Sequence, residues 1–210
     1  MRDDTALLII DMQRDFLDPD GYVARGGVDV AILRAIIPRV QSLLHAARVA
    51  GITVIHTREG HRSDLADLNA AKQRRASRAG APIGSRGPLG RLLVRGEPGH
   101  AIIAELAPLP GEPVIDKPGY GAFYQTDLEL VLRRAGIKAL AVCGVTTDVC
   151  VHSTVREAID RGFECVTVGD ACAAGDPAIH EAMLACIAGE GGILGQVAST
   201  EQVLTAWRAS

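Results

Sequence analysis

The segment from Ala139 to Asp160 (ALAVCGVTTDVCVHSTVREAID) constrains this chain more than any other. An apolar run over Ala139–Val142 breaks at Cys143-Gly144, and apolar residues recur at helical spacing from about Asp148. This pattern predicts a strand, a tight turn and a helix. Cys150 falls in the first helical turn, where unpaired backbone N–H groups and the helix dipole would lower a thiol pKa. A nucleophile is one interpretation, and a small packing residue is the other.

The overall composition bounds the class of protein. With 210 residues, of which 48% are hydrophobic, we expect a single domain over residues 1–210. A formal net charge of −3 argues against a nucleic-acid or membrane-surface binder. The early apolar run Ala6–Ile10 is too short for a signal sequence or a membrane span, so we expect a cytoplasmic protein. Five cysteines without a C-x-x-C pair indicate neither a disulfide framework nor a structural zinc site.

The rest of the chain alternates between short apolar runs and segments with helical spacing. The expected strands cover residues 5–10, 53–56, 113–116, 139–142, 164–168 and 193–197. The expected helices cover residues 30–50, 127–135, 177–190 and 200–207, besides the one that begins at Asp148. Pro38 predicts a kink or a split in the first helix. Apolar strands that alternate with amphipathic helices are typical of an α/β fold with a parallel sheet covered on both faces.

Residues 57–111 form a long stretch that is rich in Gly, Pro, Arg and Ser. At most one short helix, near His100–Leu106, is expected in it. Because irregular stretches of this length are uncommon in a compact domain, we interpret it as a lid, a substrate loop or an oligomer contact. Its Arg-rich patch Lys72–Arg78 (KQRRASR) is interpreted as a solvated loop or a subunit contact.

Three reactive residue types follow three of the expected strands. Asp11, Lys117 and Cys150 each come just after a strand, and ligands of open parallel sheets bind at the carboxyl ends of the strands. We therefore expect these side chains to lie together. Asp11 would accept the thiol proton, and Lys117 would hold that carboxylate and stabilise thiolate and oxyanion. Backbone N–H groups around Val145, Thr146 and Cys150 would form an oxyanion hole.

Three blocks in this order resemble the signature segments of the isochorismatase-like cysteine hydrolases. They are IIDMQRDF (residues 9–16), DKPGYGAF (116–123) and GVTTDVCVHSTVREAIDRGFE (144–164). The resemblance covers nearly the whole chain and implies a three-layer, Rossmann-like fold with a six-stranded parallel sheet. It also implies a catalytic triad of Cys150, Asp11 and Lys117, and a cis peptide bond between Val145 and Thr146.

Within this family, the residues favour cleavage of a C–N bond through a thioester. Members that hydrolyse the vinyl ether of isochorismate typically have no cysteine at the nucleophile position, where this chain has Cys150. Nicotinamidase-type members carry an Asp-x-His metal motif after the second strand, where this chain reads HTREGHRSDLADL (residues 56–68). We therefore expect no metal and no cofactor, with His56 and His61 as the alternative metal ligands.

The same block and the segments after it (KQRRASRAGAPIG, RGEPGHAIIAEL) are similar to the branch of the family that acts on ureido compounds, such as biuret hydrolase and ureidoacrylate amidohydrolase. A small, planar, amide-rich substrate needs paired donors and acceptors. We expect Arg58, Gln125 and Glu190 to supply them, and Phe16 and Tyr120 to form walls. Where the biuret branch would carry a polar residue, this chain has Tyr120. The expected partners are a small-molecule substrate and further copies of the chain, in a dimer or tetramer.

The sequence also bears on four other functions. Another small-amide hydrolase, nicotinamidase-like or acting on N-carbamoyl amino acids, is the nearest alternative. A dinucleotide-binding protein needs G-x-G-x-x-G after the first strand, where this chain has Asp11-Met12-Gln13. A papain-like pair is disfavoured because His152 lies two residues from Cys150, and such positions do not face each other on a helix. A catalytically silent binding relative stays open, because an intact triad shows competence and not use.

Overall fold

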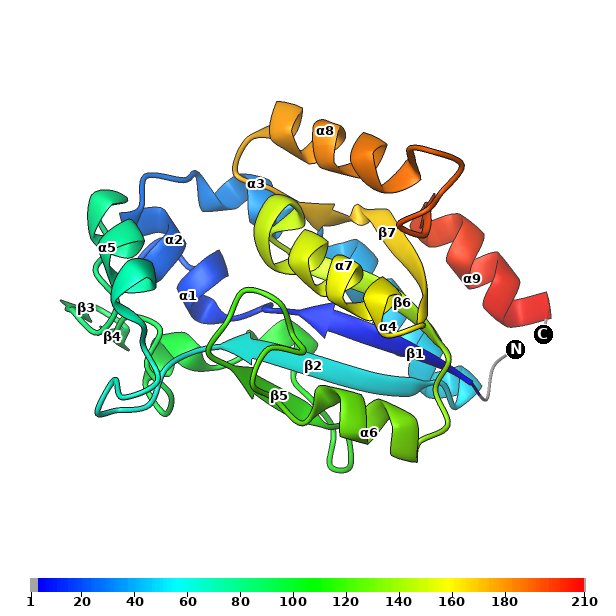
Figure 1. The fold of residues 1–210 in the computed structure, drawn as a ribbon, viewed down its shortest axis with the longest axis horizontal. Helices are drawn as coiled ribbons and strands as arrows, with labels where there is room; N and C mark the ends of the chain where they lie inside the picture. Colours follow the sequence, from blue (N-terminus) through cyan, green and yellow to red (C-terminus); the bar gives the residue numbers. More distant parts are fainter. Residues whose placement is uncertain (1–3, 210) are drawn as a thin grey trace.

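The computed structural model describes residues 4–209, and within them six parallel strands form one main sheet. In chain order these strands are β1 (Thr5–Ile10), β2 (Thr53–Glu59), β5 (Val114–Lys117), β6 (Ala139–Val145), β7 (Glu164–Ala173) and β8 (Gln196–Ala198). Their order across the sheet is β5-β2-β1-β6-β7-β8. The predicted α/β fold with a six-stranded parallel sheet is confirmed for the described residues (Figure 1).

The middle of the sheet is β1, which pairs with β2 on one side and with β6 on the other. Its residues Leu7 to Ile10 are buried, as expected for a strand covered on both faces. The chain first builds outward from β1 through β2 to β5 and then returns to the other side of β1 with β6. The crevice at the carboxyl ends of β1 and β6 is therefore the topological switch point, where open α/β sheets bind their ligands.

Helices cover both faces of the sheet (Figure 1). They include α4 (Ile37–Ala50), α6 (Leu128–Arg134), α7 (His152–Asp160), α8 (Pro177–Ala188) and α9 (Thr200–Ala209). Helix α4 lies behind the sheet in Figure 1 and α7 lies in front of it. The predicted helix over residues 30–50 is split, as Pro38 indicated, into α3 (Val30–Arg34) and α4, with Pro38 in the first turn of α4.

The stretch Val30–Ala50 is long and apolar enough to cross a membrane by length and composition alone. Its apolar residues Val40, Leu43 and Ala47 are buried in the core of the domain. A core helix of a globular domain meets the same criteria of length and composition.

The long stretch over residues 57–111 is more regular than its composition predicts. Strand β2 continues through Glu59, and the Arg-rich patch forms helix α5 (Ala70–Arg78), so its interpretation as a loop was wrong. The Asn69 side chain caps α5 by accepting a hydrogen bond from the Lys72 backbone N–H (2.8 Å). The shorter elements of the chain are α1 (Arg14–Leu17), α2 (Tyr22–Arg25), strands β3 (Arg86–Gly87) and β4 (Gly90–Arg91), and the 3₁₀ turns η1 (Pro98–His100) and η2 (Ala104–Leu106).

Candidate active site

The carboxyl ends of β1 and β5 supply a buried ion pair. Asp11 Oδ2 lies 2.8 Å from Lys117 Nζ, and neither side chain has exposed surface. Thr57 in β2 donates its hydroxyl to Asp11 Oδ1 (2.6 Å) and accepts the Asp11 backbone N–H (3.1 Å). The carboxylate therefore has one fixed orientation at the strand end, with each oxygen assigned to a partner.

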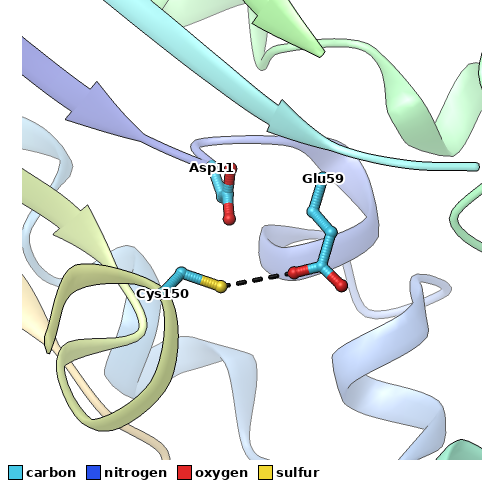
Figure 2. A group of neighbouring side chains, drawn as sticks. All are labelled: Asp11, Glu59 and Cys150. Carbon is cyan, nitrogen blue, oxygen red and sulfur yellow. Dashed lines mark hydrogen bonds between the residues drawn. The ribbon is translucent and has the colours of Figure 1, made fainter. Parts of the chain in front are cut away.

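Cys150 lies opposite this pair, so the structure brings Asp11, Lys117 and Cys150 together as expected from their strand-end positions. A carboxylate oxygen of Asp11, one of Glu59 and the sulfur of Cys150 all lie within 4.8 Å of one another (Figure 2). The Cys150 thiol donates a hydrogen bond to Glu59 Oε2 (3.3 Å). The group is nearly closed to solvent, since Cys150 is 2% exposed and Glu59 is 3% exposed.

Glu59 was not among the predicted site residues. It ends β2 and is paired in register with Lys117 of β5. Its Oε2 lies 3.4 Å from Lys117 Nζ, and its Oε1 lies 2.6 Å from Lys72 Nζ. An acidic residue at the end of a strand, as at Asp11, could have indicated Glu59. The predicted strand ended three residues earlier, at His56, so Glu59 was not recognised.

Lys72 is the second functional candidate that the sequence did not reveal. It lies on the buried side of α5, and its ammonium also donates to the carbonyl of Pro118 (2.7 Å) and lies 4.9 Å from the ring centre of Tyr120. Lys117 donates to the carbonyls of Gly119 (3.1 Å) and Tyr120 (2.9 Å). Both ammonium groups therefore hold the loop after β5 against the site.

These four side chains form a charge network, which we define as Asp11, Glu59, Lys72 and Lys117. Its two carboxylates and two ammonium groups sum to zero charge. Because a buried charge without a partner is strongly destabilising, this pairing of opposite charges offsets much of the cost of burying the four groups. The two carboxylates of the network, Asp11 and Glu59, lie beside the thiol of Cys150, which donates to Glu59 (Figure 2).

Their surroundings shift the pKa values of Asp11 and Glu59 in opposite directions. Burial raises the pKa of Asp11, although Lys117 opposes that shift. Burial alone would also raise the pKa of Glu59, but the attraction of Lys117 and Lys72 outweighs it and holds the pKa below its ordinary value. Asp11 is therefore the better proton acceptor of the two, and Glu59 is the more firmly ionised group.

The Cys150 thiol differs from its sequence-based prediction. Burial raises its pKa well above the usual value, and the charges of Asp11 and Glu59 add to that effect while Lys117 opposes it. The expectation of a thiol pKa lowered by a helix N-terminus was wrong, because burial beside two carboxylates is the stronger effect. A thiol whose pKa is raised in this way needs a base before it can react as a thiolate.

A π-helical turn, η3 (Thr147–Val151), holds Cys150 between β6 and α7. The peptide bond between Val145 and Thr146 is cis, at the position that the family resemblance implies. Gly144 before it has φ +116°, and a Cβ there would collide with the Ile10 carbonyl. Only glycine allows β6 to turn this closely over β1. Isolated π turns of this kind are frequent at functional sites.

A cavity of about 730 Å³ opens beside Cys150. Of the predicted wall residues, both Phe16 and Tyr120 line it, and Thr146 of the expected oxyanion hole lines it as well. Val145 is fully buried next to it. Cys150 therefore faces a space that Phe16, Tyr120 and Thr146 of the predicted site residues also border.

The three predicted polar substrate contacts do not fit their positions. Arg58 is absent from the described lining of the cavity and forms a two-pronged ion pair with Asp116 (2.7 and 3.0 Å). Gln125 and Glu190 are exposed, do not line the cavity, and adopt left-handed backbone conformations in turns, with φ +53° and +51°. None of these three residues is in the described lining of the cavity, so the structure gives them no contact with a ligand bound there.

The ligand atoms of Asp11, Glu59 and Cys150 lie close enough together to coordinate one metal ion. The ammonium groups of Lys117 and Lys72 already lie against both carboxylates, so a cation would have to displace them. The alternative ligands have other partners: His56 Nε2 lies 3.2 Å from Glu112 and His61 Nδ1 lies 3.2 Å from Asp67. The donor set therefore suits a metal poorly, and a metal-free reaction stays a prediction.

Comparison with known proteins places this site in a family. The family model of the isochorismatase domain matches residues 5–202. The ureidoacrylate amidohydrolase RutB of a Methylorubrum extorquens strain is 34% identical over 207 residues, which cover 97% of this chain and 84% of that protein. RutB of Azorhizobium caulinodans is 33% identical over 172 residues, covering 80% of this chain and 76% of that protein.

The fold is also similar to that of solved structures. A cysteine hydrolase from Pseudomonas syringae pv. phaseolicola matches with a TM-score of 0.84 and 28% identity, covering 100% of this chain and 94% of that chain. Together with the family model and the RutB relatives, this match confirms the resemblance carried by the three sequence blocks. The chain belongs to the isochorismatase family of hydrolases.

Proposed function

We propose that this protein is a cysteine-dependent amidohydrolase that cleaves a C–N bond, other than a peptide bond, of a small ureido or amide compound. The observation that carries the proposal is the position of the Cys150 sulfur. It lies on a cavity wall, within 4.8 Å of carboxylate oxygens from both Asp11 and Glu59, with Lys117 on the same carboxylates. A protonated thiol, a base and a fixed cation are the groups that acyl transfer through a thioester requires.

In the first half-reaction, Asp11 accepts the Cys150 proton while the sulfur attacks the substrate carbonyl. Asp11 suits this role because burial raises its pKa, which makes the carboxylate more basic. Lys117, 2.8 Å from Asp11 Oδ2, stabilises the carboxylate before transfer and the negative charge on sulfur and oxygen after it. Backbone N–H groups around Thr146 and Cys150 accommodate the oxyanion of the tetrahedral intermediate.

The intermediate collapses when the C–N bond breaks. The proton held by Asp11 passes to the nitrogen, which leaves as ammonia or an amine, and the carbonyl carbon stays bound to Cys150 as a thioester. Water then attacks the thioester, Asp11 accepts the water proton, and that proton returns to the departing sulfur. Each turnover consumes one water, and the thiol and the carboxylate are restored.

Glu59 has a different task in this scheme. It is the acceptor of the Cys150 thiol in the resting state, and its own pKa is held low by Lys117 and Lys72. It therefore orients the S–H group without competing strongly for the proton. Lys72 acts through Glu59, since its ammonium fixes the other carboxylate oxygen at 2.6 Å.

The RutB relatives support a ureido substrate, because they are named ureidoacrylate amidohydrolases and both exceed 30% identity. The test is to incubate the pure protein with a panel of ureas, carbamoyl amino acids and amides, and to measure ammonia. A quenched reaction should show a mass increase on the peptide that contains Cys150. Absence of both ammonia and adduct across the panel would identify a catalytically silent relative instead.

A further inference from the structure

The cavity beside Cys150 is larger than an unsubstituted ureido compound requires. Its volume of about 730 Å³ falls within the range of roughly 300–1,000 Å³ for sites that bury a drug-sized ligand. A compound with a carbamoyl group and few further atoms would leave most of it filled with solvent.

Most of the cavity wall is apolar, and of the charge network only Glu59 is among its described lining residues. Its apolar residues include Val23, Val28, Ile32, Ala79, Val149 and Ile179, which come from α2, α3, α5, η3 and α8 and the segments between them. Ile179 is 44% exposed although it is a large hydrophobic residue. A hydrocarbon group that replaces water along these side chains gains the free energy of apolar burial.

The wall is built by direct contact between segments that are far apart in the sequence. Helices α2 and α5 lie side by side (Figure 1), and a Cβ on Gly26 would lie 3.7 Å from the Ala79 carbonyl oxygen. A Cβ on Gly175 would lie 2.8 Å from Val28 Cγ1, so the loop before α8 also closes against the α2–α3 loop. The apolar wall is therefore present before any ligand binds.

Besides Glu59, four charged residues line the cavity: Asp29, Arg75, Asp148 and Asp176. The Arg75 guanidinium lies 5.9 Å from the ring centre of Tyr120. Asp29 and Asp176 are engaged as helix caps, each accepting a backbone N–H group at the start of α3 or α8. Asp148 Oδ1, by contrast, is buried and has no hydrogen-bond partner in the described part of the chain. Asp148 and Cys150 both line the cavity, so this unpaired acceptor belongs to the same wall as the nucleophile. A substrate N–H group would satisfy it.

We infer that the substrate of this site is a urea or amide that carries a hydrocarbon substituent, an inference that rests on the amidohydrolase proposed above. The carbonyl carbon faces the Cys150 sulfur, an amide N–H donates to Asp148, and the hydrocarbon group lies against Val28 and Ile179. For a monoalkyl urea, one water is consumed and one ammonia is released, which leaves an alkyl carbamate. Unsubstituted urea and biuret fill the polar part of the site only.

The test is a homologous series of monoalkyl ureas with hydrogen, methyl, propyl and hexyl substituents, assayed by ammonia release. Each buried methylene should raise kcat/KM about fourfold until the cavity is filled. The hexyl compound should therefore exceed the methyl compound by about a thousandfold, mostly through a lower KM. A flat or falling series would overturn the inference while leaving the amidohydrolase intact.

A wall variant gives an independent measurement. Ile179→Asp should lower the ratio of kcat/KM for the hexyl and methyl compounds at least tenfold, because it places a charge on the apolar wall. Ile193→Asp is the matched control, since Ile193 is 64% exposed and does not line the cavity. Equal ratios in both variants would overturn the assignment of this wall. If the proposed amidohydrolase function itself were wrong, none of the ureas would yield ammonia and no adduct would form on Cys150.

Discussion

The two sides of the active site are built on different physical principles. On the sheet side, Asp11, Lys117 and Glu59 come from strand ends, are 0–3% exposed, and are each held by ion pairs. On the opposite side, Val28 and Ile179 come from a loop and a helix, and they contribute apolar surface to the cavity wall. The first side fixes the reaction, and the second can vary with the substrate while the reaction stays the same.

The variant with the largest expected effect replaces Cys150, the nucleophile that lies between the two sides. Cys150→Ser should lower turnover by at least about 10⁴-fold while leaving the fold unchanged, because a serine hydroxyl in this site is a far weaker nucleophile. Circular dichroism and thermal unfolding should match the wild type.

Cys186→Ser is the matched control for that variant. Cys186 is the exposed cysteine of the five, and the other four are buried. Its replacement should leave turnover within twofold. Activity that persists in Cys150→Ser would remove the thioester from the mechanism.

The next test separates the two carboxylates of the charge network. Asp11→Asn keeps the shape of the residue but removes the proton acceptor, so acylation should fall by about 10³–10⁴-fold with substrate affinity retained. Glu59→Gln keeps a hydrogen-bond acceptor for the thiol and should lose only about 10–100-fold. Single-turnover kinetics and thioester mass spectrometry measure both. If Glu59→Gln instead lost as much as Asp11→Asn, Glu59 would be the base.

A smaller effect is expected at Lys72, which acts only through Glu59. The attraction of Lys117 and Lys72 lowers the Glu59 pKa against the effect of burial, so Lys72→Met should raise that pKa and protonate Glu59 at higher pH. The acid limb of the profile of kcat/KM against pH should move upward, with a loss of about tenfold at neutral pH. Lys72→Arg should restore most of the wild-type profile. A loss of activity without any change in the pH profile would make Lys72 purely structural.

The sequence predicts the apolar strands of this protein better than the positions of its buried charged residues. Continuous apolar runs such as Thr5–Ile10 mark a buried strand directly, and that strand has the predicted bounds. Arg58 and Glu59 extend β2, but charged residues at the end of an apolar run look like the start of a loop. Glu59 can be buried at that strand end because it forms ion pairs with Lys117 and Lys72, which the local sequence does not reveal.

The same reasoning explains the outcome at the candidate site. Asp11, Lys117 and Cys150 could be predicted because parallel strands bring their carboxyl ends to one edge of the sheet. Gln125 and Glu190 could not be placed, because the direction of a turn side chain depends on backbone conformations that composition does not reveal. Helix α5 was missed because its polar face dominates the segment, although Asn69 offered a capping signal.

The smallest predicted effect concerns Asp15 in α1, a buried carboxylate that joins α2 to the long stretch over residues 57–111. Its carboxylate, 1% exposed, accepts the backbone N–H groups of Leu93 in the long stretch (2.9 Å) and of Tyr22 at the start of α2 (3.3 Å). Burial raises its pKa from 3.8 to about 6. The folded state therefore binds this proton more tightly than the unfolded state.

The stabilisation from that proton is complete below pH 4 and is lost as the pH rises through 6. The free energy of unfolding of the wild type should thus fall by up to about 3 kcal/mol, relative to Asp15→Asn, between pH 4 and pH 7. The asparagine variant should lose roughly 1 kcal/mol at every pH, because its amide can accept only one of the two N–H groups. Urea unfolding of both proteins at pH 4, 5, 6 and 7 measures the difference, in which the other titrating groups cancel. Parallel curves would show that Asp15 titrates normally and that water reaches this junction.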